Sequence, residues 1–432
     1  MSSPDERVVV TGVGMVTPFG IGREAFWNGV MESRSTARRI ESFDTDQYPT
    51  NFACVVDDSA LEPAAFLANR KSLKLMSRAT RFAMAAAALA FEDAKLARAD
   101  RSPLRCGVVH GAGGVGLHDQ DHLETLREVS ARMDDGRHGS LLDLARAHMN
   151  PLTPLKMLPN ITAAHLAIEH DLRGENSTVC TACTSGTQAV GEAMRALRHG
   201  RADVMLAGAS DAMINPMGLI GFGMLGVLST RCENPARASR PFDRDRDGFV
   251  MGEGSVMLVL ESWSHARRRG AHPLAELLGY GGCSDAYRVT DEREDGAGCV
   301  EAMRRALGDA GRDPGRVQYV NAHGTGTRMN DKTEIAALKH VFGEHSRKLA
   351  VSSTKSQIGH LVAAAGAAEI GACILALEHQ TMPPTINYET PDPDCDLDVV
   401  PNVPRPAPLE TILSNSFGFG GQNACVVLGR SA

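Results

Sequence analysis

Residues 177 to 191 read Ser-Thr-Val-Cys-Thr-Ala-Cys-Thr-Ser-Gly-Thr-Gln-Ala-Val-Gly. The pattern predicts a short apolar strand that ends near Cys180 and an amphipathic helix that begins just after Cys183. A thiol at this junction faces the free N–H groups of the first helical turn, whose partial positive charge predicts a lowered thiol pKa. The small residues around it leave room for a bound substrate. We therefore interpret Cys183 as a candidate nucleophile; a core cysteine at a helix start is the structural alternative.

Cys180 and Cys183 also form a C-x-x-C pair, which is the spacing of redox and zinc motifs. A structural zinc site needs a second pair at similar spacing, and the sequence has none. A dithiol redox centre stays open as an alternative. Because the predicted strand places Cys180 in the sheet, we interpret Cys180 as a packing residue, and we predict no metal site.

The chain has 432 residues, of which 43% are hydrophobic, and a formal net charge of -7. This size predicts one large domain or two fused domains. The mild negative charge argues against nucleic acid as a partner. The N-terminal residues lack the basic and apolar segments of a secretory signal, and no uninterrupted run of about 18 apolar residues is present. We therefore expect a cytoplasmic protein with reduced cysteines and no membrane segment.

Short β-rich runs alternate with longer helical patterns along the chain. Continuous apolar strands between amphipathic helices predict an α/β fold with buried, largely parallel sheets. The charged stretch 261–269 separates an N-terminal half, 1–262, from a C-terminal half, 263–432, with no visible sequence repeat between them. The predicted strands are 7–11, 105–110, 177–179, 203–208, 255–260, 277–283, 317–322, 349–353, 411–416 and 424–428. The main predicted helices are 78–96, 184–199, 298–310, 331–342 and 361–377.

Residues 117–159 interrupt this rhythm, because they are polar and contain several His and Met residues. We interpret this segment as an insertion that caps a dimer or forms a wall of a substrate pocket.

Two histidines follow predicted strands in the C-terminal half. His323 ends the strand in Tyr319-Val-Asn-Ala-His323, and His360 follows Lys355 in Lys355-Ser-Gln-Ile-Gly-His360. Folds of the α/β class assemble their sites at the carboxyl ends of strands. Because Cys183, His323 and His360 all lie at such places, we group them in one candidate site; a structural role for each histidine is the alternative.

The glycines of Phe417-Gly-Phe-Gly-Gly421 permit positive φ and can direct a backbone N–H into a cavity. An oxyanion hole requires such a donor, and the loss of one donor costs about 3–4 kcal/mol of barrier. A tight hairpin turn between two strands is the alternative interpretation, and the two roles are compatible.

Two further motifs are interpreted as coincidental. Gly111-Ala-Gly-Gly-Val-Gly116 matches a dinucleotide-binding pattern, but the polar residues 118–122 do not begin an amphipathic helix. Asp243, Asp245 and Asp247 resemble a calcium loop, but arginines separate them and no glutamate occupies the last ligand position. We expect a turn with internal ion pairs there.

Together these segments resemble the β-ketoacyl-acyl carrier protein synthases of the elongating, synthase II type. The resemblance covers nearly the whole chain, from Val9 to Asn423. It implies the thiolase fold, in which two related halves, each with a mixed five-stranded sheet, form five layers α-β-α-β-α and dimerise. Its most specific segments are Leu228-Ser-Thr-Arg, Ser239-Arg-Pro-Phe-Asp, Arg246-Asp-Gly-Phe-Val and Asn321-Ala-His-Gly-Thr-Gly-Thr327.

The resemblance also implies a decarboxylative Claisen condensation, which is an acyltransferase reaction. Cys183 takes an acyl group from an acyl carrier protein as a thioester, and malonyl then enters on the phosphopantetheine arm of a second carrier protein. His323 and His360 hydrogen-bond the malonyl thioester carbonyl and stabilise the enolate that forms as carbon dioxide leaves. The carbanion attacks the Cys183 thioester, whose oxyanion is held by the backbone N–H groups of Cys183 and Phe419. No cofactor resides on the enzyme itself.

Supporting roles follow from the same resemblance. Lys355 pairs with Glu334 and organises the two histidines, and Asp331 is a second supporting acid. The residues that meet the substrate are Thr325 and Thr327, which bind the phosphopantetheine arm, Phe417, and the gating Phe419 on a mobile Gly-rich loop.

Three positions depart from the family pattern. Gln422 stands where these enzymes often have threonine, and Gly226 stands where many have an arginine for carrier docking. Gly326 replaces a commoner serine, as in polyketide-type condensing enzymes. These departures imply a polyketide or polyene pathway, with a heterodimeric chain-length-factor-like partner, as the alternative to a fatty-acid homodimer. A basic patch for the acidic carrier is still offered by Arg70, Lys71 and Lys74, unless these residues only form a solvated helix end.

Other functions on this fold are weighed against the same residues. Thiolases use a second catalytic cysteine in the C-terminal half, whereas here the downstream candidate is His360 and Cys425 lies in an apolar strand. A non-catalytic chain-length factor lacks the active cysteine, so Cys183 argues against it. An acyltransferase that forms esters or amides is the third alternative, which carbon dioxide release from malonyl-carrier protein would separate from condensation.

Overall fold

The computed structural model describes residues 6–113, 127–131, 143, 146, 151–290 and 292–431. Most of the predicted insertion, 117–159, lies outside these residues. The glycine motif 111–116 is described only as far as Gly113, where the chain leaves the strand β5 (Cys106–Ala112).

The N-terminal half forms a mixed sheet. In the described chain its strand order from the inner edge outward is β1-β8-β7-β5-β6, and the short strand β2 (Gly20–Ile21) extends from β1. Strand β5 pairs in parallel with β6 and β7, whereas β8 pairs antiparallel with β7 and β1. The other strands are β1 (Val8–Thr17), β6 (Asn176–Val179), β7 (Val204–Asp211) and β8 (Gly254–Ser262).

The C-terminal half repeats this topology. Its order is β9-β15-β14-β10-β11, with the same two parallel and two antiparallel pairings. Numbered by their order along each half, the described strands of both sheets read 1-5-4-2-3. The halves are therefore related in structure although their sequences show no repeat; the boundary at residue 262 stays a prediction. The strands are β9 (Ala275–Ser284), β10 (Tyr319–Asn321), β11 (Ala350–Ser352), β14 (Thr411–Gly418) and β15 (Gln422–Arg430).

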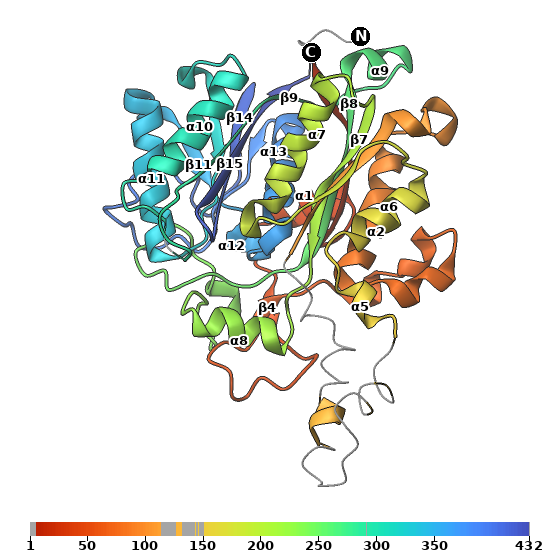
Figure 1. Ribbon diagram of the computed structural model, residues 1–432. Helices are drawn as coiled ribbons and strands as arrows, with labels where there is room; N and C mark the ends of the chain where they lie inside the picture. Colours follow the sequence, from red (N-terminus) through yellow and green to blue (C-terminus); the bar gives the residue numbers. More distant parts are fainter. Residues whose placement is uncertain are drawn as a thin grey trace.

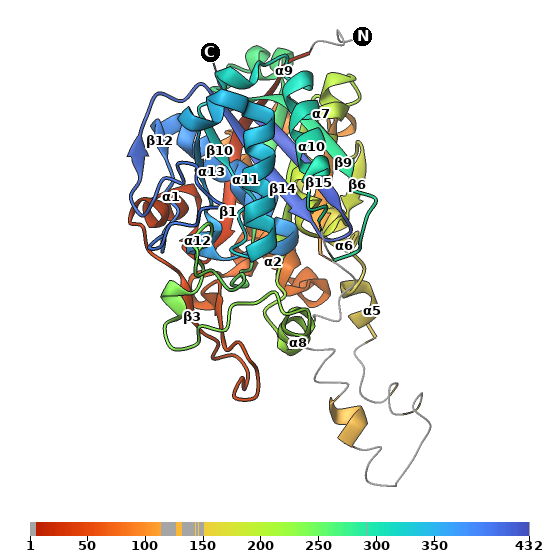
Figure 2. The ribbon, with the colours of Figure 1, turned by 90° about the vertical axis from the view of Figure 1, so that its left-hand side faces the viewer.

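Helices form three layers around the two sheets, which meet through an antiparallel contact between β1 and β9 (Figures 1 and 2). Helices α7 (Ser185–Arg198) and α13 (Ala365–His379) lie between the sheets and share one core with both inner faces. The outer face of the N-terminal sheet is covered by α2 (Arg78–Asp93) and α6 (Ile161–His170). The outer face of the C-terminal sheet is covered by α10 (Ala297–Asp309) and α11 (Arg328–Phe342). The predicted five-layer, thiolase-like architecture is confirmed.

Smaller elements complete the described fold. They are the helices α1 (Arg23–Met31), α5 (Thr153–Lys156), α8 (Pro216–Met224), α9 (Trp263–Arg268) and α12 (Lys355–Ile358), and the strands β3 (Ala37–Arg39), β4 (Phe52–Cys54), β12 (Thr381–Met382) and β13 (Arg405–Pro406).

Small residues bring the two central helices into close contact. A Cβ atom on Gly186 would lie 2.7 Å from the backbone N of Ala367, and one on Gly366 would lie 2.0 Å from Thr187 Oγ1. Only glycine therefore lets the first turns of α7 and α13 meet at this distance. Among the described residues, Val362–His379 is the one helix long and apolar enough to cross a membrane, and it is buried here as the central helix of the core.

Two expectations about local structure have opposite outcomes. The expectation of largely parallel sheets is wrong, because each half has as many antiparallel as parallel pairings and β14 turns directly into β15. The apolar strands reflect burial on both faces, which does not require parallel pairing.

The expected turn with ion pairs is confirmed: Asp243 pairs with Arg240 at 3.3 Å and Asp245 with Arg244 at 3.3 Å.

Candidate active site

Two equivalent junctions carry the candidate residues. Strand β6 leads through a 3-10 turn, Ala182–Thr184, into α7, and β11 leads past His360 through a second 3-10 turn, Val362–Ala364, into α13. The first residue of each turn has a positive φ, 49° and 47° respectively. The middle residue is Cys183 in the first turn and Ala363 in the second. Both junctions end at the touching N-termini of the central helices, which places Cys183 beside His360.

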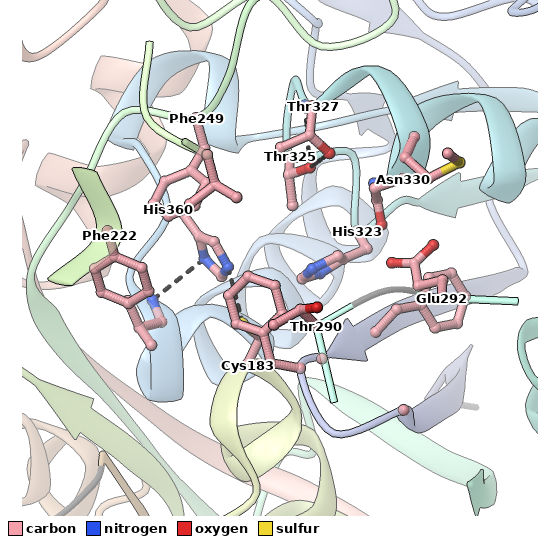
Figure 3. Close-up of a pocket in the computed structure, with 17 residues that line it drawn as sticks. Cys183, Phe222, Phe249, Thr290, Glu292, His323, Thr325, Thr327, Asn330 and His360 are labelled. Atoms are coloured by element: carbon pink, nitrogen blue, oxygen red, sulfur yellow. Dashed lines mark hydrogen bonds between the residues drawn. The ribbon is translucent and has the colours of Figure 1, made fainter. Parts of the chain in front are cut away.

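Cys183, His323 and His360 meet in one pocket (Figure 3), and all three side chains are buried. His360 Nε2 lies 3.1 Å from Cys183 Sγ. The rings of His323 and His360 have centroids 5.3 Å apart and cross at 83°. The pocket has about 810 Å³ of empty space, including the part open to solvent. The residues grouped from sequence are therefore brought together.

Hydrogen bonds determine which ring nitrogen of each histidine carries the proton. Val362 N–H donates to His360 Nδ1 at 3.2 Å, and Lys355 Nζ lies 3.3 Å from His323 Nδ1. Each Nδ1 is therefore an acceptor, and the proton of each neutral imidazole is on Nε2. Burial, and then the charge of Lys355, holds the pKa of both histidines well below the usual value. The pocket thus offers two neutral Nε2–H donors, one of them at Cys183.

The same tautomers argue against a metal ion. One ligand atom each from Cys183, His323 and His360 lies within 4.8 Å of the others, which is close enough for a shared ion. A metal binds the lone pair of an imidazole nitrogen. In both histidines that lone pair is at Nδ1, which already faces an N–H or ammonium donor. The donor set suits hydrogen bonding to an oxygen better than metal coordination.

The predicted lowering of the Cys183 pKa is wrong. Burial raises the pKa of this thiol to about 12 and outweighs the opposite effects of the Lys355 charge and of a hydrogen bond from the Phe419 N–H. The partial charge of the helix start was expected to prevail, but Cys183 is largely buried in the pocket wall, and desolvation of the charged form is the larger effect. Cys183 is therefore a thiol at neutral pH, and acylation must remove its proton as the thioester forms.

Lys355 pairs with Glu369 rather than with Glu334, so the predicted pairing is also wrong. The Lys355 ammonium forms a buried ion pair with the Glu369 carboxylate and donates to the backbone O of His323 at 2.5 Å. Glu334 instead accepts the backbone N–H groups of His323 and Gly324 at 2.9 and 2.8 Å. The reason is position: Glu369 projects from the central helix α13, whereas Glu334 belongs to α11 in the outer layer.

Glu334 and Asp331 hold the loop that carries His323, Thr325 and Thr327. Glu334 also accepts from Asn415 Nδ2 at 3.1 Å, and burial raises its pKa to about 7. Asp331 accepts the backbone N–H groups of Phe242 and Gly326 at 2.8 and 3.1 Å. The two threonine hydroxyls lie 3.0 Å apart and line the pocket. Both acids therefore position the loop and do not face the reacting atoms.

The Gly-rich loop forms a hairpin turn and also supplies a backbone hydrogen-bond donor to the pocket. Gly420 and Gly421 have φ of 86° and 71° and connect β14 to β15, so the hairpin interpretation is confirmed. The same turn directs the Phe419 N–H at Cys183. The ring of Phe417 is buried and lies 6.0 Å from that of His323. Phe417 and Phe419 both line the pocket.

Other predicted residues lie outside the pocket. Arg70, Lys71 and Lys74 are exposed on a 3-10 helix, Arg70–Leu75. The interpretation of Cys180 as a packing residue is wrong, because β6 is the edge strand of its sheet and leaves Cys180 exposed. Both cysteines of the C-x-x-C pair are free thiols.

Sequence reasoning missed several residues of the site. Glu369 is the acid that pairs with Lys355, and its signal was a single acid within the apolar segment 361–377. The ring of Phe249 lies 5.1 Å from that of His360 at 75°. Glu292 and Phe222 also line the pocket and carry no distinguishing sequence signal.

Covalent acyl transfer through a cysteine is the chemistry that this pocket supports, on the fold of the thiolase-like acyltransferases. Two family descriptions match the chain: "Beta-ketoacyl synthase, N-terminal domain" over residues 5–266 and "Beta-ketoacyl synthase, C-terminal domain" over residues 274–389. The chain belongs to the β-ketoacyl synthase family.

Similar proteins come from both fatty-acid and polyketide systems. The chain is 40% identical to 3-oxoacyl-[acyl-carrier-protein] synthase 2 of Coxiella burnetii, over 98% of both chains. It is 41% identical to the tetracenomycin polyketide synthase ketoacyl synthase alpha subunit of Streptomyces glaucescens, over 99% of this chain and 97% of that one. A solved ishigamide ketosynthase/chain length factor has a TM-score of 0.89 at 36% identity, with 99% of this chain and 100% of that chain covered. A type II polyketide synthase ketosynthase in complex with its acyl-carrier protein has a TM-score of 0.87 at 36% identity, with the same coverage.

Proposed function

We propose that this β-ketoacyl synthase condenses malonyl-acyl carrier protein with an acyl group that Cys183 holds as a thioester. The observation that carries the proposal is the pair of neutral Nε2–H donors of His323 and His360 beside the sulfur. A pair of donors at one oxygen stabilises a developing enolate, and covalent storage divides the condensation into two easier steps.

In the first step the Cys183 sulfur attacks the thioester carbonyl of an acyl carrier protein. The bond to the carrier sulfur breaks, and the proton of the Cys183 thiol leaves with the carrier thiol. The oxyanion of this step is held by the backbone N–H groups of Cys183 and Phe419, of which the Phe419 N–H already donates to the sulfur.

In the second step malonyl-carrier protein binds with its thioester oxygen at the two Nε2–H groups. The carbon–carbon bond to the carboxylate breaks, carbon dioxide leaves, and the electron pair passes to the enolate that His323 and His360 stabilise. The enolate carbon then bonds to the acyl carbonyl carbon, and the Cys183 sulfur leaves as a thiolate, which takes up one proton from solvent and returns to the thiol. Lys355, fixed by Glu369, keeps its ammonium at His323 Nδ1 and so keeps the His323 proton on Nε2.

The remaining assignments follow from the same reaction. Thr325 and Thr327 bind the phosphopantetheine arm that arrives on the carrier protein, Phe417 meets the substrate, and Phe419 gates the pocket. The enzyme needs no resident cofactor or metal. We place it in the cytoplasm, where carrier proteins and their thioesters occur.

A polyketide or polyene pathway is the second candidate. Gly326 favours it, because glycine stands there in place of the commoner serine, as in polyketide-type condensing enzymes. The backbone suits glycine at this position: its φ is 84°, and an added Cβ atom would lie 3.2 Å from the backbone O of Gly248. Relatives named as polyketide ketosynthases support it, as does the solved ketosynthase/chain length factor. In that case the protein works in a heterodimer with a chain-length-factor-like subunit, and otherwise as a homodimer.

The reaction itself is tested by mixing the purified protein with an acyl-carrier protein and malonyl-carrier protein. We expect carbon dioxide and 3-oxoacyl-carrier protein in a ratio of about one to one, because each condensation breaks one bond to a carboxylate. The products are measured by carbon dioxide capture and by mass spectrometry of the carrier. Acyl transfer to an alcohol or amine without carbon dioxide release would instead identify an ester- or amide-forming enzyme. Elongation only after addition of a second subunit would favour the polyketide candidate.

Reversal of the basic patch is expected to weaken carrier binding without changing the chemistry. The triple variant Arg70→Glu/Lys71→Glu/Lys74→Glu should raise KM for the acidic carrier about tenfold at low salt, with kcat retained and a smaller effect at high salt. A matched control changes three exposed arginines on the outer side of the C-terminal half, Arg304, Arg312 and Arg316, to glutamate. An equal rise of KM in the control would show a general charge effect and contradict the assigned docking patch.

A further inference from the structure

Glu292 is an acidic side chain in the pocket that the proposed mechanism does not use. It lies between β9 and α10 and lines the same pocket as Cys183 and His323. In the view of Figure 3 it lies on the side of the pocket where Asn330 is drawn. Its Oε2 atom is buried and has no hydrogen-bond partner. A carboxylate in this position would be an uncompensated charge, which a pocket of this kind disfavours.

The surroundings of Glu292 supply no counter-charge among the described residues. The neighbouring Arg293 is exposed and pairs with Asp295 at 2.7 Å. Burial first, and then the charges of nearby carboxylates, raise the pKa of Glu292 to about 8. Three acids lie near Glu292: Asp285, which follows β9, and Asp331 and Glu334 on α11. Across the pocket lie the neutral side chains of Cys183, His323 and His360. The ammonium group of Lys355 is paired with Glu369.

We propose that Glu292 is a specificity-determining residue for the malonyl step: as the neutral acid it admits the anionic malonyl group, and as the carboxylate it repels that group. This inference rests on the proposed function, in which the first substrate enters as a neutral acyl chain and the second carries a carboxylate. The charge of Glu292 therefore acts on the second step and leaves the first unchanged. Two like charges in a partly buried pocket repel strongly enough to weaken binding about tenfold or more.

The direction of the pH effect follows from the sign of the shift. Below about pH 8 Glu292 keeps its proton and the malonyl anion binds well; above that pH the acid ionises and the anion is repelled. Glu292→Gln keeps the shape and the donor of the neutral acid and removes the titration. Glu292→Asp keeps a titratable acid at the same place. Glu334, whose pKa is raised to about 7, interacts with Glu292 through its charge, so Glu334→Gln is measured beside these proteins, and the ratio of its alkylation by an anionic and by a neutral reagent should still fall with pH as in the parent.

The pocket charge is measured without any carrier protein, by alkylation of Cys183 with iodoacetate, an anion, and with iodoacetamide, which is neutral. The ratio of the two rate constants cancels the thiolate fraction of Cys183. We expect this ratio to fall about tenfold between about pH 7 and 9.5 in the parent protein and in Glu292→Asp, and to stay constant in Glu292→Gln. The exposed Glu294→Gln is the matched control and should behave as the parent. The two rate constants are obtained by mass spectrometry of the peptide that contains Cys183, in proteins that also carry Cys180→Ala.

The malonyl assignment is measured in a second arm, as KM for malonyl-carrier protein and the rate of Cys183 acylation over the same pH range. We expect KM to rise about tenfold above about pH 8 in the parent and not in Glu292→Gln, while acylation is equal in both. The inference is overturned if the ratio and KM change with pH in Glu292→Gln as they do in the parent. If the alkylation ratio depends on Glu292 but the parent never releases carbon dioxide, the proposed function has failed and the malonyl role fails with it.

Discussion

Cys183→Ala is expected to abolish acyl transfer from the carrier protein and all condensation, with losses of about 10⁴-fold or more. The thiol is the one cysteine sulfur that lines the pocket among the described residues, and it lies at the junction where the Phe419 N–H can hold an oxyanion. Within the described part of the chain, no hydroxyl lines the pocket at that junction. The loss is measured as labelled acyl groups retained on the protein after denaturation and as 3-oxoacyl product.

The matched control for this substitution is Cys180→Ala, three residues earlier, at the end of the edge strand. Because Cys180 is exposed and does not line the pocket, its loss should leave acylation within about twofold of the parent. Cys183→Ala should retain measurable decarboxylation of malonyl-carrier protein, since both histidine donors remain. Acyl label that persists on Cys183→Ala, or that disappears from Cys180→Ala, would contradict the assignment of the nucleophile.

His323→Ala and His360→Ala are each expected to lower carbon dioxide release from malonyl-carrier protein by about 10²–10³-fold. Each substitution removes one of the two Nε2–H donors at the enolate oxygen, and the remaining donor cannot replace it from its fixed ring position. Acylation of Cys183 should change much less, because its oxyanion is held by backbone N–H groups. The two half-reactions are followed separately in single-turnover experiments.

The solvent-accessible His340→Ala on α11 is the control for loss of an imidazole elsewhere in the C-terminal half. Because burial and Lys355 hold the pKa of His323 and His360 well below the usual value, carbon dioxide release should stay level as the pH falls from about 7.5 to 5.5. Glu334, which holds the His323 loop, also titrates in this range, with a pKa of about 7. A decline with the midpoint of an ordinary histidine that persists in Glu334→Gln would show that a charged imidazole interferes and that the assigned tautomers are wrong.

The layers of the fold were predictable because apolar strands and amphipathic helices alternate clearly in the sequence. The strand ends were informative because Cys183, His323 and His360 each follow a strand. The parallel neighbours β10 and β11 bring His323 and His360 to one edge of the C-terminal sheet, whereas Cys183 follows β6 of the other sheet and meets them where the N-termini of α7 and α13 touch. The direction of strand pairing was not predictable, because a strand that is buried on both faces has the same apolar sequence pattern whether its neighbours are parallel or antiparallel.

Contacts between separate elements were harder to predict than the elements. The partner of Lys355 depended on which helix enters the centre of the molecule, and Glu369 on α13 does so while Glu334 on α11 does not. The Cys183 pKa depended on burial, which is a property of the surrounding layers and not of the helix start alone. Exposure of Cys180 followed from the edge position of β6, which local sequence does not encode.

The two matching turns before α7 and α13 also carry information about ancestry. Equal strand order in both sheets and a positive φ at the same step of each turn are what fusion of two copies of a half-length gene leaves behind. Each half presents a side chain at the molecular centre from the same step of its turn. One half carries sulfur there, at Cys183, and the other a methyl group at Ala363, with an imidazole three residues before it. The two halves thus share a backbone plan and contribute different chemistry to a single asymmetric centre.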